Sequence, residues 1–188
     1  MSKVRLILPT PKHKDQILEY KKEFIENNEK AHMDGTADLG RYETFEEWYV
    51  NVCNAIRGKD IKKGWVPSTT YLAISEDTKK LVGMVDIRHR LNTFLSNYGG
   101  HIGYSVRPSE RRKGFGKEML KEALLICRDM RLDNVLVTCI KGNVASEKII
   151  KANGGFFDKE VPYHGEFPFD DVIIKHYWIN LNRILERK

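Results

Sequence analysis

Residues 101–120, HIGYSVRPSERRKGFGKEML, constrain the fold of this chain more than any other stretch. An apolar run ends at Val106, a turn rich in Arg and Lys follows, and Gly114 and Gly116 precede a helical pattern. Backbone N–H groups at a helix start have no acceptor within the helix, and the helix dipole adds partial positive charge there. A strand, a basic glycine loop and a helix in this order therefore predict a phosphate-binding site.

Spacing excludes two families of glycine loop. A P-loop places Ser or Thr after its Gly-Lys pair to bind magnesium, whereas Glu118 follows Lys117 here. A dinucleotide-binding fingerprint has a third glycine where this chain has Met119. The loop is therefore expected to bind a different phosphate-bearing ligand.

The segments after the loop predict a parallel strand–helix–strand unit. Apolar residues recur at helical spacing after Gly116, at Met119, Leu120, Ala123, Leu124 and Cys127. Residues 135–140 form a continuous apolar run, typical of a strand that is buried on both faces. Two parallel strands joined by a crossover helix form a right-handed unit.

The N-terminal part predicts a strand and a helix. Residues 4–8 are apolar and are followed by prolines, which is typical of a strand. From about residue 12 the spacing is helical, and Tyr20, Phe24 and Ile25 are the expected buried stripe. Residues 29–42 contain glycines and no periodicity, so we expect a loop long enough to have a function.

A second helix is expected to begin at Thr44 and to end at Gly58. Thr44 and Glu47 have the spacing of a capping box, and apolar residues follow on one face, namely Phe45, Trp48, Tyr49, Val52 and Ile56. We interpret Trp48 as a core residue because it lies on this stripe. Residues 70–74 and 81–88 then predict an antiparallel hairpin.

The C-terminal part completes the sheet. A helix is expected from Asn143 to the glycine pair at 154–155, and a strand from Phe156. A polar segment with Pro162 and Pro168 follows, and residues 172–181 alternate as a strand does. We expect one mixed α/β domain over residues 1–188.

Composition favours an ordinary globular protein. Hydrophobic residues are 41%, charged residues are 31% and the net charge is +6, which does not by itself indicate a nucleic-acid partner. Cys53, Cys127 and Cys139 are few and far apart, so we expect reduced thiols in or near the core. The N-terminus does not resemble a signal peptide and no apolar run could span a membrane, so we expect a cytoplasmic protein without a membrane partner.

Two motifs together resemble the GNAT superfamily of N-acetyltransferases. The first is the R-x-x-G-x-G loop with its Val-x-Pro lead-in, residues 106–116, and the second is Asn143-Val144-Ala145-Ser146 after the next strand. The resemblance covers residues 71–156. It implies a mixed sheet of about six to seven strands with a splayed parallel pair, flanked by about four helices, and a bulge in the strand before the loop.

The resemblance also implies acetyl-CoA as cosubstrate, no metal, and direct transfer of the acetyl group to a primary amine in a ternary complex. The pantetheine arm is expected along the main chain of Tyr104, Ser105 and Val106, where a backbone N–H would donate to the acetyl carbonyl. The pyrophosphate is expected on the loop, through Arg111, Arg112, Lys113, Gly114, Phe115, Gly116 and Lys117. Asn143 is either a helix cap or a pantetheine ligand, with Ser146 beside it.

The family often carries a tyrosine as general acid about seven residues after this asparagine, and Ile150 stands there instead. Tyr104 and Cys139 are the candidate replacements. The candidate bases are Asp86, His89 and His101, with a salt bridge from Asp86 to Arg88 or Arg90 as the alternative for the first.

The acceptor is expected near residues 26–47, which are rich in acidic residues and would attract a polyamine, an amino sugar or a lysine-bearing peptide. An alternative is a catalytically silent acyl-CoA-binding regulator. A nucleic-acid binder is a third reading, but the basic loop has no aromatic residue besides Phe115. A homodimer is compatible with all three readings.

Overall fold

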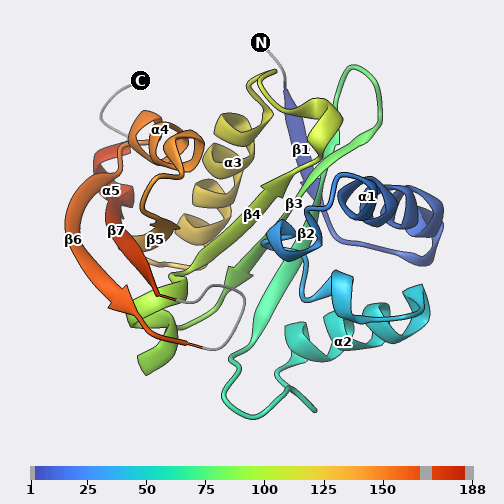
Figure 1. Ribbon diagram of the computed structural model, residues 1–188, viewed down its shortest axis with the longest axis horizontal. Coiled ribbons are helices and arrows are strands. Elements are labelled where there is room, and N and C mark those ends of the chain that lie inside the picture. Colours follow the sequence, from blue (N-terminus) through green and yellow to red (C-terminus); the bar gives the residue numbers. More distant parts are fainter. Residues whose placement is uncertain (1–2, 166–170, 185–188) are drawn as a thin grey trace.

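The computed structural model describes residues 3–165 and 171–184, which form two sheets (Figure 1). The first sheet is antiparallel and has the order β1–β2–β3–β4, and the second has the order β5–β7–β6. The strands are β1 (Val4–Ile7), β2 (Ser68–Ser75), β3 (Leu81–Arg88), β4 (Ile102–Val106), β5 (Asn134–Ile140), β6 (Phe156–Tyr163) and β7 (Val172–Asn180). The helices are α1 (Lys14–Glu26), α2 (Phe45–Arg57), α3 (Phe115–Asp129), α4 (Val144–Ala152) and the short α5 (Leu181–Ile184).

The expected mixed α/β architecture with a splayed central pair is confirmed, in the form of an α+β fold. The two sheets meet where His101 donates its backbone N–H to Leu136 O (2.7 Å), and the Leu136 N–H donates to His101 Nδ1 (2.9 Å). Beyond this junction, the described residues contain no further hydrogen bond between β4 and β5. The expected bulge is not found, because β4 pairs with β3 without a register shift.

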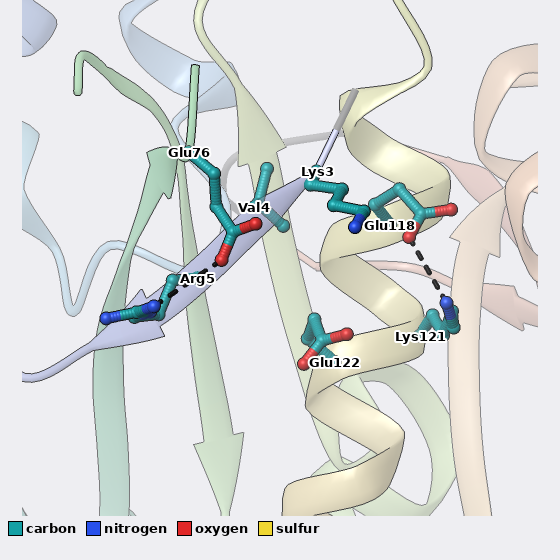
Figure 2. A pocket seen from close by; sticks show the side chains of 7 residues that line it. All are labelled: Lys3, Val4, Arg5, Glu76, Glu118, Lys121 and Glu122. Atoms are coloured by element: carbon teal, nitrogen blue, oxygen red, sulfur yellow. Dashed lines mark hydrogen bonds and ion pairs between the residues drawn. The ribbon is translucent and has the colours of Figure 1, made fainter. Parts of the chain in front are cut away.

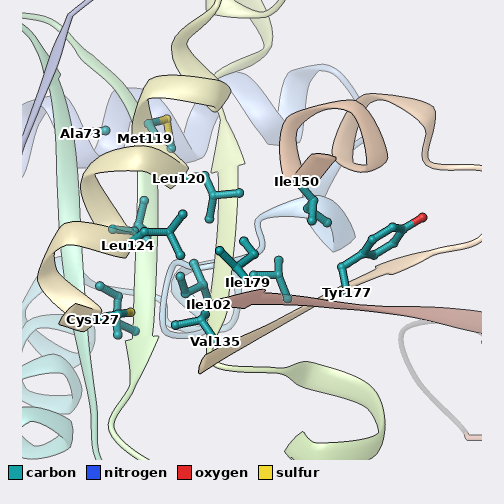
Figure 3. Packing of buried hydrophobic residues seen from close by; sticks show 14 of the residues in the cluster. Ala73, Ile102, Met119, Leu120, Leu124, Cys127, Val135, Ile150, Tyr177 and Ile179 are labelled. Carbon is teal, nitrogen blue, oxygen red and sulfur yellow. The ribbon is translucent and has the colours of Figure 1, made fainter. Parts of the chain in front are cut away.

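Each face of the first sheet carries its own core. α1 and α2 cover one face and bury Tyr20, Phe24 and Trp48, while α3 covers the other (Figure 3). The prediction that Ile25 is buried is wrong: Ile25 is 45% exposed. The buried stripe is Ile17, Tyr20 and Phe24, whose spacing of three and four residues keeps them on one side of the helix.

The second helix begins and ends as predicted. Glu47 N–H donates to Thr44 Oγ1 (3.2 Å) and Thr44 N–H donates to Glu47 Oε2 (3.1 Å), which completes the capping box. Gly58 ends the helix with φ +64°, a conformation that glycine adopts at low cost. Trp48 is fully buried, and its indole N–H donates to Thr36 O (2.7 Å).

The C-terminal strands differ in detail from the prediction. Pro162 lies within β6, which is tolerated because β6 is an edge strand and a proline there removes no inner ladder bond. β7 inserts between β5 and β6. Pro168 lies outside the described residues. Cys53, Cys127 and Cys139 are all free thiols, as expected, and the latter two are buried.

The loop after α1 crosses β4. It contains two short helical turns, Lys30–His32 and Leu39–Arg41. Between them Gly35 has φ +72°, and a Cβ on it would lie 2.3 Å from Gly103 O. Glycine is therefore needed here for both conformation and space. The contact brings the loop against the strand that begins the splayed pair.

Candidate functional site

A cleft of about 1820 Å³ follows the gap between β4 and β5. Its floor is formed by the two strands, and one end is formed by the basic loop before α3. The loop after α1, the start of α4 and the ends of β6 and β7 complete its walls. The residues of the two sequence motifs are thus brought to one place.

The basic loop presents unpaired backbone donors to this cleft. Gly114 caps α3 with φ +88°, and nothing lies within 4 Å of the position of its missing Cβ. Among the described residues, the N–H groups of Arg112, Gly114, Phe115 and Gly116 have no protein acceptor. An open helix start with free donors fits a phosphate group.

Gly116 has a second role. A Cβ on Gly116 would lie 2.7 Å from Ile149 Cδ1, so the absence of a side chain allows α3 and α4 to pack closely. Gly114 therefore shapes the loop, and Gly116 sets the spacing of the two helices behind it.

Two arginines near the loop are held by acids of α1 and its following loop. Arg107 is buried and forms an ion pair with Glu23, which also accepts the Ser109 N–H (2.6 Å). Arg111 binds Glu29 with both guanidinium ends, at 2.9 Å for Nη1–Oε1. These hydrogen bonds lower the pKa of Glu29. The expected contribution of Arg111 to phosphate binding is thus reduced by its existing partner.

The other basic side chains of the loop are differently placed. Lys113 forms an ion pair with Glu110 at 2.8 Å. Among the described contacts, Arg112 and Lys117 have no acidic partner, and both line the cleft. They are the side chains most available to an anion in this cleft.

Strand pairing decides which backbone groups face the cleft. Arg107 N–H donates to Val82 O (2.9 Å) and Arg88 N–H to His101 O (2.8 Å). Because alternate residues of an antiparallel strand bond to the same neighbour, Tyr104 and Val106 direct their backbone groups away from β3 and toward β5. Both are therefore placed as expected for a ligand that pairs with the strand edge.

Ser105 differs from this expectation. Its backbone belongs to the β3 side of the ladder, opposite Met84. Its Oγ hydrogen-bonds Tyr20 Oη (2.8 Å) and donates to Asp34 O, so the side chain fixes α1 and the following loop to β4. We interpret Ser105 as structural, although it borders the cleft.

Tyr104 reaches across the cleft to the start of α4. Its hydroxyl is 2.8 Å from Ser146 Oγ. Burial raises the pKa of Tyr104, so the phenol is protonated at neutral pH. Asn143 Oδ1 accepts the Ser146 N–H (3.0 Å), which is the predicted helix cap. Its amide N–H groups have no acceptor among the described hydrogen bonds, so the ligand role stays compatible with the cap.

Ile150 and Cys139 do not offer a proton donor of the same kind. Ile150 is fully buried in the core between α3, α4 and β7 and does not line the cleft (Figure 3). Cys139 borders the cleft, but its side chain is buried in the apolar core, whereas the Tyr104 hydroxyl reaches Ser146 across the cleft. Tyr104 is the candidate that the geometry favours.

The three candidate bases are occupied elsewhere. Asp86 accepts from Thr70 Oγ1 (2.9 Å) and pairs with Arg88 (3.4 Å), which is the alternative that the sequence left open, and Asp86 does not line the cleft. His89 bonds Thr69 Oγ1 at 2.8 Å. Burial lowers the pKa of His101 to about 4, and its neutral ring joins the two sheets.

Asp34 belongs to the acidic segment 26–47 that was expected near the acceptor, but the sequence did not single it out. It lies in the loop after α1, lines the cleft and remains accessible to solvent. The surrounding protein desolvates its carboxyl and raises its pKa, against the opposing effects of Arg88 and His32. The available sequence signal was an Asp-Gly pair within an acidic loop, which did not distinguish Asp34 from its acidic neighbours.

A second, smaller hollow lies between β1 and α3 (Figure 2). Its charged side chains largely pair with one another, as Arg5 does with Glu76 (3.6 Å) and Lys121 with Glu118 (3.4 Å). It is bordered by the free edge of β1, but neither the basic glycine loop nor Asn143 and Ser146, which line the cleft, belongs to its lining. We therefore place the functional site in the cleft.

Two other features are not found among the described residues. No group of three or more His, Cys, Asp or Glu side chains there could hold a metal ion. Within the same residues, no helix has the length and apolar character needed to cross a membrane.

Solved structures with known activities share this fold. A spermidine/spermine N-acetyltransferase from Vibrio cholerae, in mutant forms, has a TM-score of 0.68 and 14% identity, covering 98% of this chain and 98% of its own. An acetyltransferase from Salmonella typhimurium that modifies the N-terminal serine of a ribosomal subunit protein has a TM-score of 0.65 and 14% identity, covering 96% of each chain. A ribosomal α-N-protein acetyltransferase in complex with coenzyme A has a TM-score of 0.68 and 15% identity, covering 96% of this chain and 95% of its own.

Sequence comparison gives the family. No curated protein is similar enough in sequence to count as a match. The family described as "Acetyltransferase (GNAT) domain" matches residues 5–155, which include both motifs and the whole splayed pair. The chain therefore belongs to the GNAT acetyltransferase family.

Proposed function

We propose that this chain is an acetyl-CoA-dependent N-acetyltransferase that acts on a primary amine by direct attack in a ternary complex. The observation that carries the proposal is that one cleft is lined by the free backbone donors near Gly114, by Tyr104 and by Asp34. The structural neighbours support it, because their acceptors are spermidine or a protein N-terminus, and one of them binds coenzyme A.

The loop residues supply the phosphate end of the proposed site. The N–H groups of Arg112, Gly114, Phe115 and Gly116 have no protein acceptor and would donate to the phosphates, and Arg112 and Lys117 add charge. Asn143 is available to the pantetheine arm through its amide N–H groups. Tyr104 and Val106 offer the strand edge, and the Val106 N–H is our candidate donor to the carbonyl oxygen of the thioester.

Asp34 and Tyr104 are our candidates for proton transfer. As the C–N bond forms and the C–S bond breaks, Asp34 accepts the proton that the amine nitrogen loses, and the Tyr104 hydroxyl donates one to the departing sulfur. Asp34 then releases its proton to solvent and Tyr104 regains one, so protons balance. In this proposal Asp34 replaces Asp86, which is held by Thr70 and Arg88.

The competing candidate is an acyl-CoA-binding regulator, favoured by the presence of Ile150 where the family often has tyrosine. A thiol-release assay with acetyl-CoA and a panel of amines distinguishes the two. We expect release of CoA that depends on the amine. Tight acetyl-CoA binding without release across the panel would establish the regulator instead.

The proposed enzyme has three free cysteines, which suits the reducing cytoplasm. We propose that the protein is cytoplasmic. The homodimer is a separate proposal about its assembly. Sedimentation with and without acetyl-CoA would measure the oligomeric state.

A further inference from the structure

Three aromatic side chains gather at the end of the cleft that lies away from the basic loop. Phe94 and Tyr98 belong to the connection between β3 and β4, which contains the helical turn Leu95–Gly99, and Tyr163 ends β6. Their ring centroids are 5.4 Å apart for Phe94 and Tyr98, 4.8 Å for Tyr98 and Tyr163, and 6.3 Å for Phe94 and Tyr163. We name these three residues the aromatic cluster.

The aromatic cluster lies beyond the junction of the two sheets. Tyr98 O accepts a hydrogen bond from Thr138 Oγ1 (3.0 Å), on the strand that His101 joins to β4. The basic loop follows the other end of β4, and the four residue-to-residue steps from Ile102 to Val106 span about 13 Å. An acyl donor with its phosphates on the loop and its thioester near Tyr104 would not reach the aromatic cluster, so the cluster stays open to the second substrate.

The surroundings of the aromatic cluster are mainly apolar. Ile102, Val172 and Ile174 line the same end of the cleft. Phe94 is 53% exposed, so a large apolar ring faces open space in the cleft wall. An exposed aromatic side chain in the wall of a cleft is typical of a ligand site.

Charge is sparse at this end. Arg88 donates to Gly99 O (3.0 Å) and pairs with Asp86, so its charge is largely matched. Glu29 is bound by Arg111. Asp34 is the carboxylate that remains toward the cleft, among the described residues of its lining. One carboxylate in the same cleft as three aromatic rings suits an acceptor with a single amine on an apolar body, whereas a polyamine calls for several acids.

We infer that the acceptor is a primary amine carried on an aromatic-sized apolar group, with the group in the aromatic cluster and the amine toward Asp34. This inference rests on the proposed function and narrows it. A small arylalkylamine and a peptide that begins with an aromatic residue share this chemistry.

The test compares phenethylamine with ethylamine, spermidine and phenylalanyl-glycinamide in the thiol-release assay. The wild-type protein should show kcat/KM at least about 10-fold higher for phenethylamine than for ethylamine or spermidine, since an apolar pocket discriminates on this scale. The peptide separates the two sources of the amine: a kcat/KM above that of phenethylamine assigns the peptide, and a lower value assigns the small amine.

Variants then locate the site. Phe94→Ala and Tyr98→Ala should each lower kcat/KM for phenethylamine at least about 10-fold and change that for ethylamine less than about 2-fold. Phe156→Ala is the matched control, because Phe156 is 52% exposed on β6 but does not line the cleft. It should leave both values unchanged. Circular dichroism melting confirms that each variant is folded.

The outcomes separate this inference from the proposed function. Equal or better turnover of ethylamine or spermidine overturns the inference and leaves the N-acetyltransferase proposal standing. Absence of CoA release with every amine overturns the proposed function. Calorimetry of phenethylamine against the CoA-loaded protein then decides the inference: binding that Phe94→Ala weakens supports the aromatic site, and no binding overturns it.

Discussion

Arg111 and Glu29 form a two-point ion pair that ties the basic loop to the segment after α1. The Arg111 guanidinium also lies over the Phe24 ring, 5.6 Å from its centroid. This arrangement places a residue of the phosphate-binding motif in contact with the segment that carries Asp34 to the cleft. The proposed phosphate-binding loop and the segment that carries the proposed base are therefore in direct contact.

Arg111→Ala should affect the acceptor more than the cofactor. Because the guanidinium is held by Glu29, we expect a rise of a few-fold in the KM for the amine, as for the loss of a partly exposed ion pair of about 1 kcal/mol. The Kd for acetyl-CoA should change less than about 2-fold. Glu29→Gln should act in the same direction. If Arg111→Ala alone weakens acetyl-CoA binding about 10-fold, Arg111 is a phosphate ligand instead.

Gly114→Asp should abolish acetyl-CoA binding, since a carboxylate would stand among the free N–H groups of the loop and repel the pyrophosphate. Gly64→Asp is the matched control: Gly64 has φ +85° and, like Gly114, nothing within 4 Å of its missing Cβ, but it lies outside the cleft. Both variants should lose similar stability, about 1 kcal/mol, from the left-handed backbone. Calorimetry should show a lost affinity for Gly114→Asp alone, and unchanged affinity would remove the loop from the site.

Tyr104→Phe should lower kcat by about 10²-fold or more, the range typical of a general acid. Acetyl-CoA affinity should stay within about 2-fold, because the ring and its backbone remain in place. Tyr177→Phe serves as control, since the Tyr177 hydroxyl donates to Glu147 (3.0 Å) and does not line the cleft. Equal kcat for Tyr104→Phe and wild type would exclude Tyr104 as proton donor.

The pH profile of kcat/KM should show an acidic limb that reports the titration of Asp34. Desolvation by the surrounding cleft walls raises the pKa of Asp34, so activity should fall with decreasing pH at values above those of an ordinary carboxyl, as Asp34 takes up a proton. Asp34→Asn should remove this limb and lower kcat/KM about 10²-fold. A limb that persists in Asp34→Asn would assign it to another group.

The same pKa shift has a consequence for stability. A folded-state pKa above the unfolded value means that the folded protein binds this proton more tightly, so stability is lost as pH rises through the interval between the two values. Asp34→Asn should therefore be more stable than wild type at pH 7. The difference in the free energy of unfolding, measured with urea, should vanish below about pH 3.9.

Ile150→Tyr, which restores the residue that the family often has here, should impair the protein. Ile150 is fully buried, and a would-be Cβ of Gly155 lies only 2.4 Å from its Cγ2, so a larger ring cannot fit without displacement. We expect a loss of about 1–3 kcal/mol in urea unfolding, the usual cost of overpacking, and no gain in kcat. A stable variant with a higher kcat would contradict the role given to Tyr104.

Local patterns in the sequence predicted the elements well. The Thr44 capping box, Trp48 in the core and the glycine that opens α3 each depend on residues within a few positions of one another. The prediction for Ile25 is wrong because helical spacing alone does not fix the centre of a wide apolar stripe.

The site was harder to predict because its decisive contacts join distant segments. The sequence identified Arg111 as basic but could not show that Glu29 holds it. It identified Asp34 only as one acid among many, and its place depends on Gly35 packing against Gly103. Tyr104 was one of two candidate acids until its bond to Ser146 placed its hydroxyl across the cleft.

The imidazole of His101 connects the two sheets, because its Nδ1 accepts a hydrogen bond from the Leu136 N–H of β5. Its Nδ1 must lack a proton to accept the Leu136 N–H, and its pKa is lowered to about 4 from 6.5. As pH falls from 6.5 to about 4, His101 takes up a proton in the unfolded chain but not in the folded protein, so the folded state loses stability. Mild acid should therefore loosen the shared edge of the two sheets while each apolar core is still intact.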